Sequence, residues 1–107
     1  MRPIPPKMRE EMSDDPYYSR CARQSNECMG FIEWHHAMIY ARRQVNKKWA
    51  IVPLCHEHHE GKYKNDEYAR HIALQRATAC DLMKYPRANW EQEKKYLKKK
   101  YEDLDNN

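Results

Sequence analysis

Two pairs of adjacent histidines, His35–His36 and His58–His59, lie on either side of a basic loop and a short apolar run. Five of the six histidines in the chain fall between residues 35 and 59. A neutral imidazole binds divalent metal ions, and its unperturbed pKa of about 6.5 lets it exchange protons near neutral pH. This clustering therefore indicates metal binding, general acid–base catalysis or both.

Three cysteines supply a second set of potential ligands. Cys55 and His58 are three residues apart, so on a helix both side chains reach the same ion. Cys21 and Cys28 would complete a Cys3His tetrahedron, a ligand set that zinc favours. The interval between Cys21 and Cys28 is wider than in most zinc knuckles and requires a looped connection. The sequence predicts a structural zinc site, with ordinary thiols as the alternative.

The histidine ligand in this knuckle is open to a second interpretation. His59 lies four residues after Cys55 and could replace His58 as the zinc ligand, although we favour His58. The fourth cysteine, Cys80, is expected to be a packed free thiol on a helix. His56 is expected to be exposed.

The order of the remaining residues resembles a known enzyme family. His35–His36 after a strand, Asn46 in the next loop and the segment "IVPLCHEHH" ending at His59 are similar to the HNH endonucleases. The core of that family is the ββα-metal, or His-Me, finger. The resemblance covers about residues 20–60. It implies a small, zinc-stabilised, stand-alone nuclease of the kind that phages carry, which hydrolyses DNA phosphodiester bonds.

The resemblance also implies a role for each matching residue. His35 and His59 would hold one catalytic divalent ion, His36 would be the general base that activates water, and Asn46 would orient His36. Some family members have a further histidine four residues after the second metal ligand, where this chain has Tyr63. Two protein ligands suit Mg²⁺ or Mn²⁺, which keep several waters, whereas imidazole would also accept Ni²⁺ or Zn²⁺.

Basic residues crowd these histidines, and the chain carries a net charge of +4. Such residues bind phosphates without regard to base sequence. Nothing in the sequence predicts a base preference or separates DNA from RNA. The predicted nucleic-acid contacts are Arg42, Arg43, Lys47, Lys48, Lys62 and Lys64. The lysines near the C-terminus share their segment with acidic residues and are interpreted first as a solvated face.

Strand and helix signals predict an α+β fold with a small ββα-metal core, a zinc knuckle and C-terminal helices. Proline-rich residues 1–17 are expected to form an extended N-terminal arm, either docked on the domain or disordered. Residues 18–107 are expected to form one domain, with a core at 20–64 and a helical part at 65–105. Strands are predicted at 31–36 and 49–54, and helices at 55–60, 67–83 and from 90 onward. Asn65 or Asp66 is expected to cap the second helix and Asn89 the third, whose apolar stripe includes Leu104. Residues 37–48 fit either a short helix or a structured loop.

No apolar run is long enough to span a membrane, and the first residues lack the apolar core of a secretory signal, so we expect a cytoplasmic protein. A homodimer is compatible with the apolar stripe of the last helix. Two other functions stay open. One is a non-catalytic zinc module that binds nucleic acid or protein, and the other is a zinc hydrolase with a Cys/His-bound catalytic ion.

Overall fold

The centre of the fold is a pair of antiparallel strands. The first carries His35 and His36, and the second ends at Cys55, just before His58 and His59. In the computed structural model, which describes residues 3–86 and 89–101, β1 (Ile32–His36) pairs with β4 (Ile51–Cys55). Their register places Ile32 opposite Cys55 at one end of the pair and His36 opposite Ile51 at the other. Both predicted strands are confirmed. The second begins later than predicted, because Lys48–Ala50 form a short 3-10 helix, η2.

The segment between these strands is a second, smaller hairpin. Strands β2 (Ile39–Tyr40) and β3 (Arg43–Gln44) pair across a two-residue turn. Both turn residues have positive φ, 51° at Ala41 and 67° at Arg42, as a type I′ turn requires. The turn therefore presents Arg42 and Arg43 at an exposed tip. This hairpin answers the question that the sequence left open for residues 37–48.

Within the described part of the chain, four helices follow β4: α2 (His56–His59), α3 (Asp66–Arg76), α4 (Ala79–Met83) and α5 (Trp90–Lys100). The side chains of Asn65 and Asn89 cap α3 and α5, as the sequence predicts. The single helix predicted at 67–83 is wrong. Ala77 is extended, and Thr78 starts a new helix through a reciprocal capping box with Asp81.

That break changes the position of Cys80. It lies on α4 and is exposed, so the expectation of a packed thiol is also wrong.

The N-terminal segment is helical where the sequence predicts an extended arm, and of the two alternatives, docked or disordered, it is docked. Pro6 begins α1 (Pro6–Ser13), a position at which proline's missing N–H costs nothing, and η1 (Pro16–Ser19) follows. Met12 is fully buried in a small cluster with Ile4, Tyr18 and Ile51. Tertiary packing against the sheet thus orders a segment whose local sequence signals are weak.

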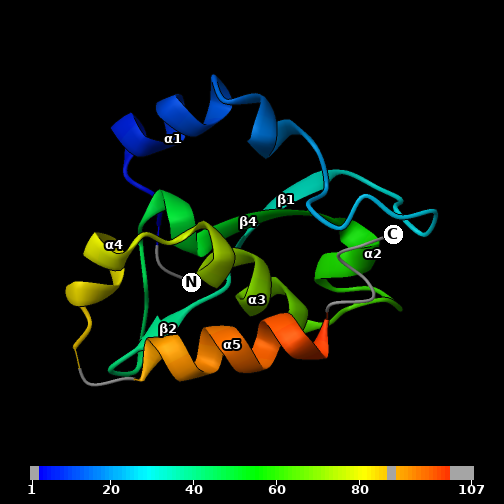
Figure 1. Ribbon diagram of the computed structural model, residues 1–107. Helices are drawn as coiled ribbons and strands as arrows, with labels where there is room; N and C mark the ends of the chain where they lie inside the picture. The colour runs from blue at the N-terminus through cyan, green and yellow to red at the C-terminus, as the bar shows by residue number, and fades with distance from the viewer. Residues whose placement is uncertain (1–2, 87–88, 102–107) are drawn as a thin grey trace.

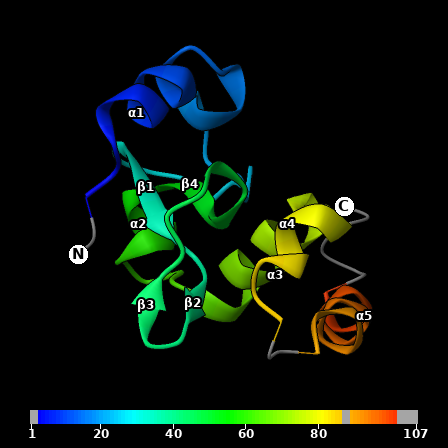
Figure 2. The ribbon, with the colours of Figure 1, turned by 90° about the vertical axis from the view of Figure 1, so that its left-hand side faces the viewer.

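The helices lie on both sides of the β1–β4 pair. Figure 1 shows α1 on one side, and α3 and α5 on the other. The view turned by 90° shows the same order (Figure 2). The larger core lies on the side of α3 and α5, where Leu74, Trp90 and Leu97 pack with Val52 and Leu54. The chain is therefore α+β, as predicted. Among the described residues, none of the helices has the length and apolar character that a membrane span needs.

Candidate functional site

A cluster of three thiols and one imidazole lies where the loop before β1 meets α2. The ligand atoms of Cys21, Cys28, Cys55 and His58 all lie within 4.8 Å of one another. His58 Nδ1 is 3.4 Å from the sulfur of Cys21, 3.7 Å from that of Cys28 and 3.1 Å from that of Cys55. In a tetrahedral Cys3His zinc site, bond lengths of about 2.3 and 2.0–2.1 Å place the nitrogen about 3.5 Å from each sulfur. The residues therefore fit a four-coordinate metal ion.

Two turns fold the long interval between Cys21 and Cys28 so that both sulfurs meet. Gln24 N–H donates to the carbonyl of Cys21 at 3.2 Å, and Cys28 N–H donates to that of Ser25 at 3.2 Å. Gly30 then has a φ of +91°, and a Cβ there would lie 2.8 Å from the Cβ of His56. A glycine at this position lets the loop lie directly against α2, which carries His58.

Polar groups around the cluster orient its ligands. His58 Nε2 lies 3.1 Å from Ser25 Oγ, so with Nδ1 toward the sulfurs the opposite N–H donates to the hydroxyl. Metal-bound histidines commonly have such a partner, which fixes the ring and its tautomer. The backbone N–H of Met29 donates to the Cys55 sulfur at 3.4 Å, and that of Ser25 donates to the Cys28 sulfur at 3.4 Å. It is His58, and not His59, that lies against the thiols.

The two most buried thiols differ in acidity. Burial raises the pKa of Cys21 to about 11. Burial also raises the pKa of Cys55, but the N–H groups of Met29 and His58 and the neighbouring thiols outweigh it and lower the value overall. Burial lowers the pKa of His58, which favours the neutral form that binds metals.

A second group of side chains lies on the face of the sheet toward α3. The rings of His35 and His59 approach to 4.9 Å between centroids. His59 Nδ1 lies 2.7 Å from a carboxylate oxygen of Glu33, which leaves its Nε2 free for a ligand. Burial, followed by the proximity of His59, lowers the pKa of His35. The structure thus brings together two imidazoles that the resemblance assigns to one ion.

Glu33 is not among the site residues predicted from the sequence. Its second oxygen lies 3.4 Å from Nδ1 of His56, and the His59 hydrogen bond is the main reason that its pKa is lowered. A signal was present, because residues two apart on a strand share a face, and Glu33 stands two before His35. His56, expected to be exposed, is exposed.

His36 lies apart from this pair, at the end of β1. Its Nε2 is 3.1 Å from Oδ1 of Asn46, which follows the β2–β3 hairpin. The side chain is largely enclosed, with 7% of the residue exposed. The contact joins the two residues to which the resemblance assigns the roles of general base and orienting residue.

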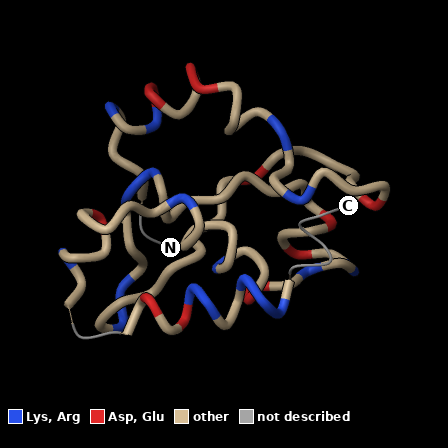
Figure 3. The backbone as a smooth tube through the Cα atoms, viewed as in Figure 1, with Lys and Arg blue, Asp and Glu red and all other residues tan. Residues whose placement is uncertain are grey.

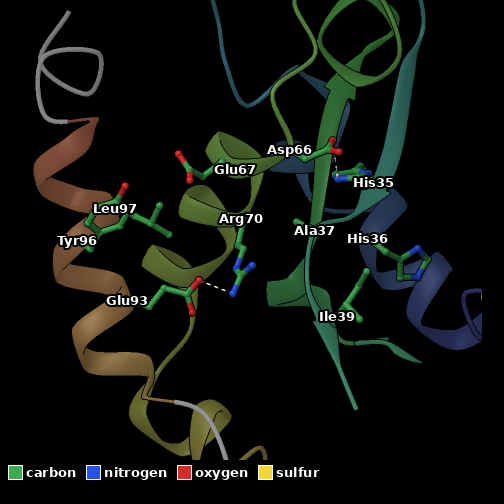
Figure 4. Close-up of a pocket in the computed structure, with 10 residues that line it drawn as sticks. All are labelled: His35, His36, Ala37, Ile39, Asp66, Glu67, Arg70, Glu93, Tyr96 and Leu97. Atoms are coloured by element: carbon green, nitrogen blue, oxygen red, sulfur yellow. Dashed lines mark ion pairs between the residues drawn. The ribbon is translucent and has the colours of Figure 1, made fainter. Parts of the chain in front are cut away.

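A cavity of about 350 Å³ opens beside His35 and His36, between β1–β2 and the helices α3 and α5. Figure 4 shows Asp66 beside His35, with Nε2 to Oδ1 at 4.0 Å, and Arg70 paired with Glu93 across the cavity from Ile39. The charged lining consists of Asp66, Glu67, Glu93 and Arg70, and each carboxylate is paired with a basic side chain, namely Lys64, Lys100 and Arg70 in that order. Because Arg70, the basic residue of this lining, is engaged by Glu93, the cavity offers a phosphate little attraction.

The predicted nucleic-acid contacts lie on separate elements. Arg42 and Arg43 lie at the hairpin tip, and Lys47 and Lys48 follow it, all exposed. Lys48 is paired with Glu11 at 2.7 Å. Lys62 and Lys64 follow α2 and are exposed. Figure 3 shows basic residues spread over several elements, with acidic and basic residues both present along α5.

Comparison with protein-family models, curated proteins and solved structures finds no match to this chain. The candidate site is therefore assigned from its own geometry.

Proposed function

We propose that this chain is a metal-dependent endonuclease of the HNH type that hydrolyses phosphodiester bonds in DNA. The observation that carries the proposal is the arrangement of four residues on one strand–hairpin–strand–helix unit. His35 and His59 approach each other across β1 and α2, while His36 is held by Asn46 from the intervening segment. Strands β1 and β4 followed directly by α2 would then form a ββα-metal core.

Two metal sites follow from this proposal. The Cys3His cluster would hold a structural zinc, because its sulfur–nitrogen distances match a zinc tetrahedron and its ligands come from three separate segments. His35 and His59 would hold the catalytic ion, Mg²⁺ or Mn²⁺, with Ni²⁺ or Zn²⁺ as alternatives. Such an ion stabilises negative charge on the phosphate and on the leaving oxygen.

Protein side chains would supply the general base, position a metal ligand and bind the flanking phosphates. His36 would accept a proton from the attacking water at Nδ1, because its Nε2 is occupied by Asn46. Glu33 would hold the ring of His59 in place through their 2.7 Å contact. The exposed basic residues of the hairpin, Arg42 and Arg43, would bind the flanking phosphates.

A plasmid-nicking assay tests the proposal. Protein that retains its tightly bound zinc is freed of weakly bound metal and incubated with supercoiled plasmid and Mg²⁺, Mn²⁺ or Ni²⁺. We expect metal-dependent nicking that falls about 10²- to 10⁴-fold in His36→Ala, the usual contribution of a general base. His56→Ala, which removes an exposed histidine from α2, is the matched control and should cut normally.

Two outcomes would contradict the nuclease. One is no nicking with any metal, and the other is equal nicking by His36→Ala. Either would favour a zinc module that binds nucleic acid or protein without cutting it. The affinity for DNA as a function of salt concentration would then be the next measurement. Labelled RNA, tested in parallel, decides which nucleic acid is the substrate.

A further inference from the structure

The N-terminal segment contacts the proposed catalytic residues through a backbone carbonyl. Nδ2 of Asn46 donates to the carbonyl oxygen of Pro3 at 2.8 Å, across 43 positions of sequence. The other end of the same amide, Oδ1, lies 3.1 Å from Nε2 of His36. Pro3, Asn46 and His36 therefore form one line of hydrogen bonds that ends on the imidazole.

The chemistry of these groups permits one direction for this line. A backbone carbonyl only accepts, so the Asn46 atom that faces Pro3 must be the amide nitrogen. The atom that faces His36 is then the amide oxygen, which also only accepts. Nε2 of His36 must therefore carry a hydrogen, and in the neutral ring Nδ1 carries the lone pair. Without the Pro3 carbonyl, the amide could turn over and accept either tautomer.

Packing against the sheet holds Pro3 at this position. Ile4, the next residue, is 9% exposed and joins the buried cluster with Met12 and Ile51. Ile51 is the cross-strand partner of His36, so the cluster anchors the segment beside the residue that it orients. The ion pair of Glu11 with Lys48 fixes α1 at a second point.

We infer that Pro3 is a positioning residue of the site, which sets the tautomer of His36 through Asn46. The N-terminal segment is thus part of the active centre. His36 lines the cavity beside β1, and 7% of the residue is exposed, so the ring is not completely enclosed. The use of the Nδ1 lone pair in catalysis rests on the proposed function. The hydrogen bonds from Pro3 through Asn46 to His36 do not depend on it.

Nitrogen-15 NMR of the imidazoles tests the inference without any cleavage. Zinc-loaded protein is measured near pH 8, and the His36 signals are assigned by their loss in His36→Ala. We expect wild type to show only the Nε2–H tautomer of His36. A chain that starts at position 4, with the initiator methionine in place of Ile4, lacks the Pro3 carbonyl and should show both tautomers. Full-length Arg2→Ala/Ile4→Met is the control and should match wild type.

Asn46→Asp distinguishes an effect that passes through the Pro3–Asn46–His36 hydrogen bonds from a general structural effect of the truncation. A carboxylate presents an oxygen to His36 in either orientation, so in this background the truncation should leave the tautomer unchanged. If the truncated chain does not fold, full-length Asn46→Ala replaces it and should show both tautomers.

In cleavage, the truncation should lower kcat about fivefold with KM unchanged, the usual effect of one lost hydrogen bond. An Nδ1–H tautomer in wild type, or a pure Nε2–H tautomer after truncation, would overturn the inference. If truncation changes the tautomer but the protein cuts no DNA, the role of Pro3 in setting the tautomer would be supported and the proposed nuclease activity would be refuted.

Discussion

Replacing Cys55 with alanine tests the metal centre, because thiol packing and metal ligation predict very different losses of stability. Cys55 is 2% exposed, and its sulfur accepts the Met29 N–H. As a simple buried thiol it would contribute the packing of one small side chain, about 1 kcal/mol. The Met29 N–H left without a partner would add about 1–3 kcal/mol. Packing alone therefore predicts a loss of about 2–4 kcal/mol, from a total of about 5–15 kcal/mol for a domain of this kind.

Metal ligation predicts a larger effect. A structural zinc contributes about 10–16 kcal/mol of apparent binding free energy to folding. This figure is of the same size as the whole stability of such a domain, so a site that loses one of its four ligands should no longer sustain the fold. We expect Cys55→Ala to lack zinc and to be unfolded at neutral pH.

Zinc content by mass spectrometry and urea denaturation with and without a chelator measure these effects. Cys80→Ala removes an exposed thiol and should keep both zinc and stability. The metal centre would be refuted if wild type denatured at the same urea concentration with and without the chelator. A folded Cys55→Ala protein that is only 2–4 kcal/mol less stable would refute it equally.

Two further substitutions probe the surroundings of the site and the C-terminal helices. Gly30→Ala places a Cβ 2.8 Å from that of His56, at a backbone φ of +91°. We expect this substitution to lower the free energy of unfolding, measured in urea, by about 2–4 kcal/mol. An unchanged midpoint of urea denaturation would show that the loop shifts freely. Glu67 accepts hydrogen bonds from Lys100 and Tyr101, which lower the pKa of its carboxyl group below the ordinary value of 4.5. The ionised carboxylate therefore stabilises the folded protein above pH 4.5, and this contribution is lost as the pH falls through the lowered pKa. The melting temperature of Glu67→Gln should therefore lie below that of wild type at pH 7 and converge with it toward pH 3, whereas a constant difference would contradict this account.

Local sequence signals predicted the elements that position the site. Side chains with a preference for strands mark β1 and β4, and Asn65 and Asn89 cap helices where predicted. The pairing of Cys55 with His58 is also local, since it depends only on a spacing of three residues. These features depend on neighbours along the chain and not on distant contacts.

The remaining features depend on tertiary packing. Helix α1 has weak helical signals and is ordered by the burial of Met12 against the sheet. The contact of Pro3 with Asn46 uses a backbone carbonyl, a group that every residue has and that leaves no trace in the sequence. The two turns that bring Cys28 to Cys21 are held by backbone hydrogen bonds, for which a spacing of residues gives no rule.

The charges around the histidines indicate how a nucleic acid would approach under the proposed function. Asp66, Glu67 and Glu93 line the cavity beside His35, with Arg70 already paired to Glu93. Asp66 and Glu67 are paired with Lys64 and Lys100 in the same way, so the cavity offers a phosphodiester backbone little net attraction. Arg42 and Arg43 are exposed on the β2–β3 hairpin, on the chain segment that leads to Asn46. We expect the strand to be cut to approach His36 from the side of the hairpin and not from the side of α3 and α5.

Helix α2 links the proposed metal sites. It has four residues, and helices this short are not stable in isolation. His58 points from it into the thiol cluster, whereas the next residue, His59, points to Glu33 and His35. The ligation of Cys55 and His58 would hold this single turn against the sheet and, through it, the ring of His59. The structural ion would thereby become a precondition for the catalytic one, although no ligand is shared between them.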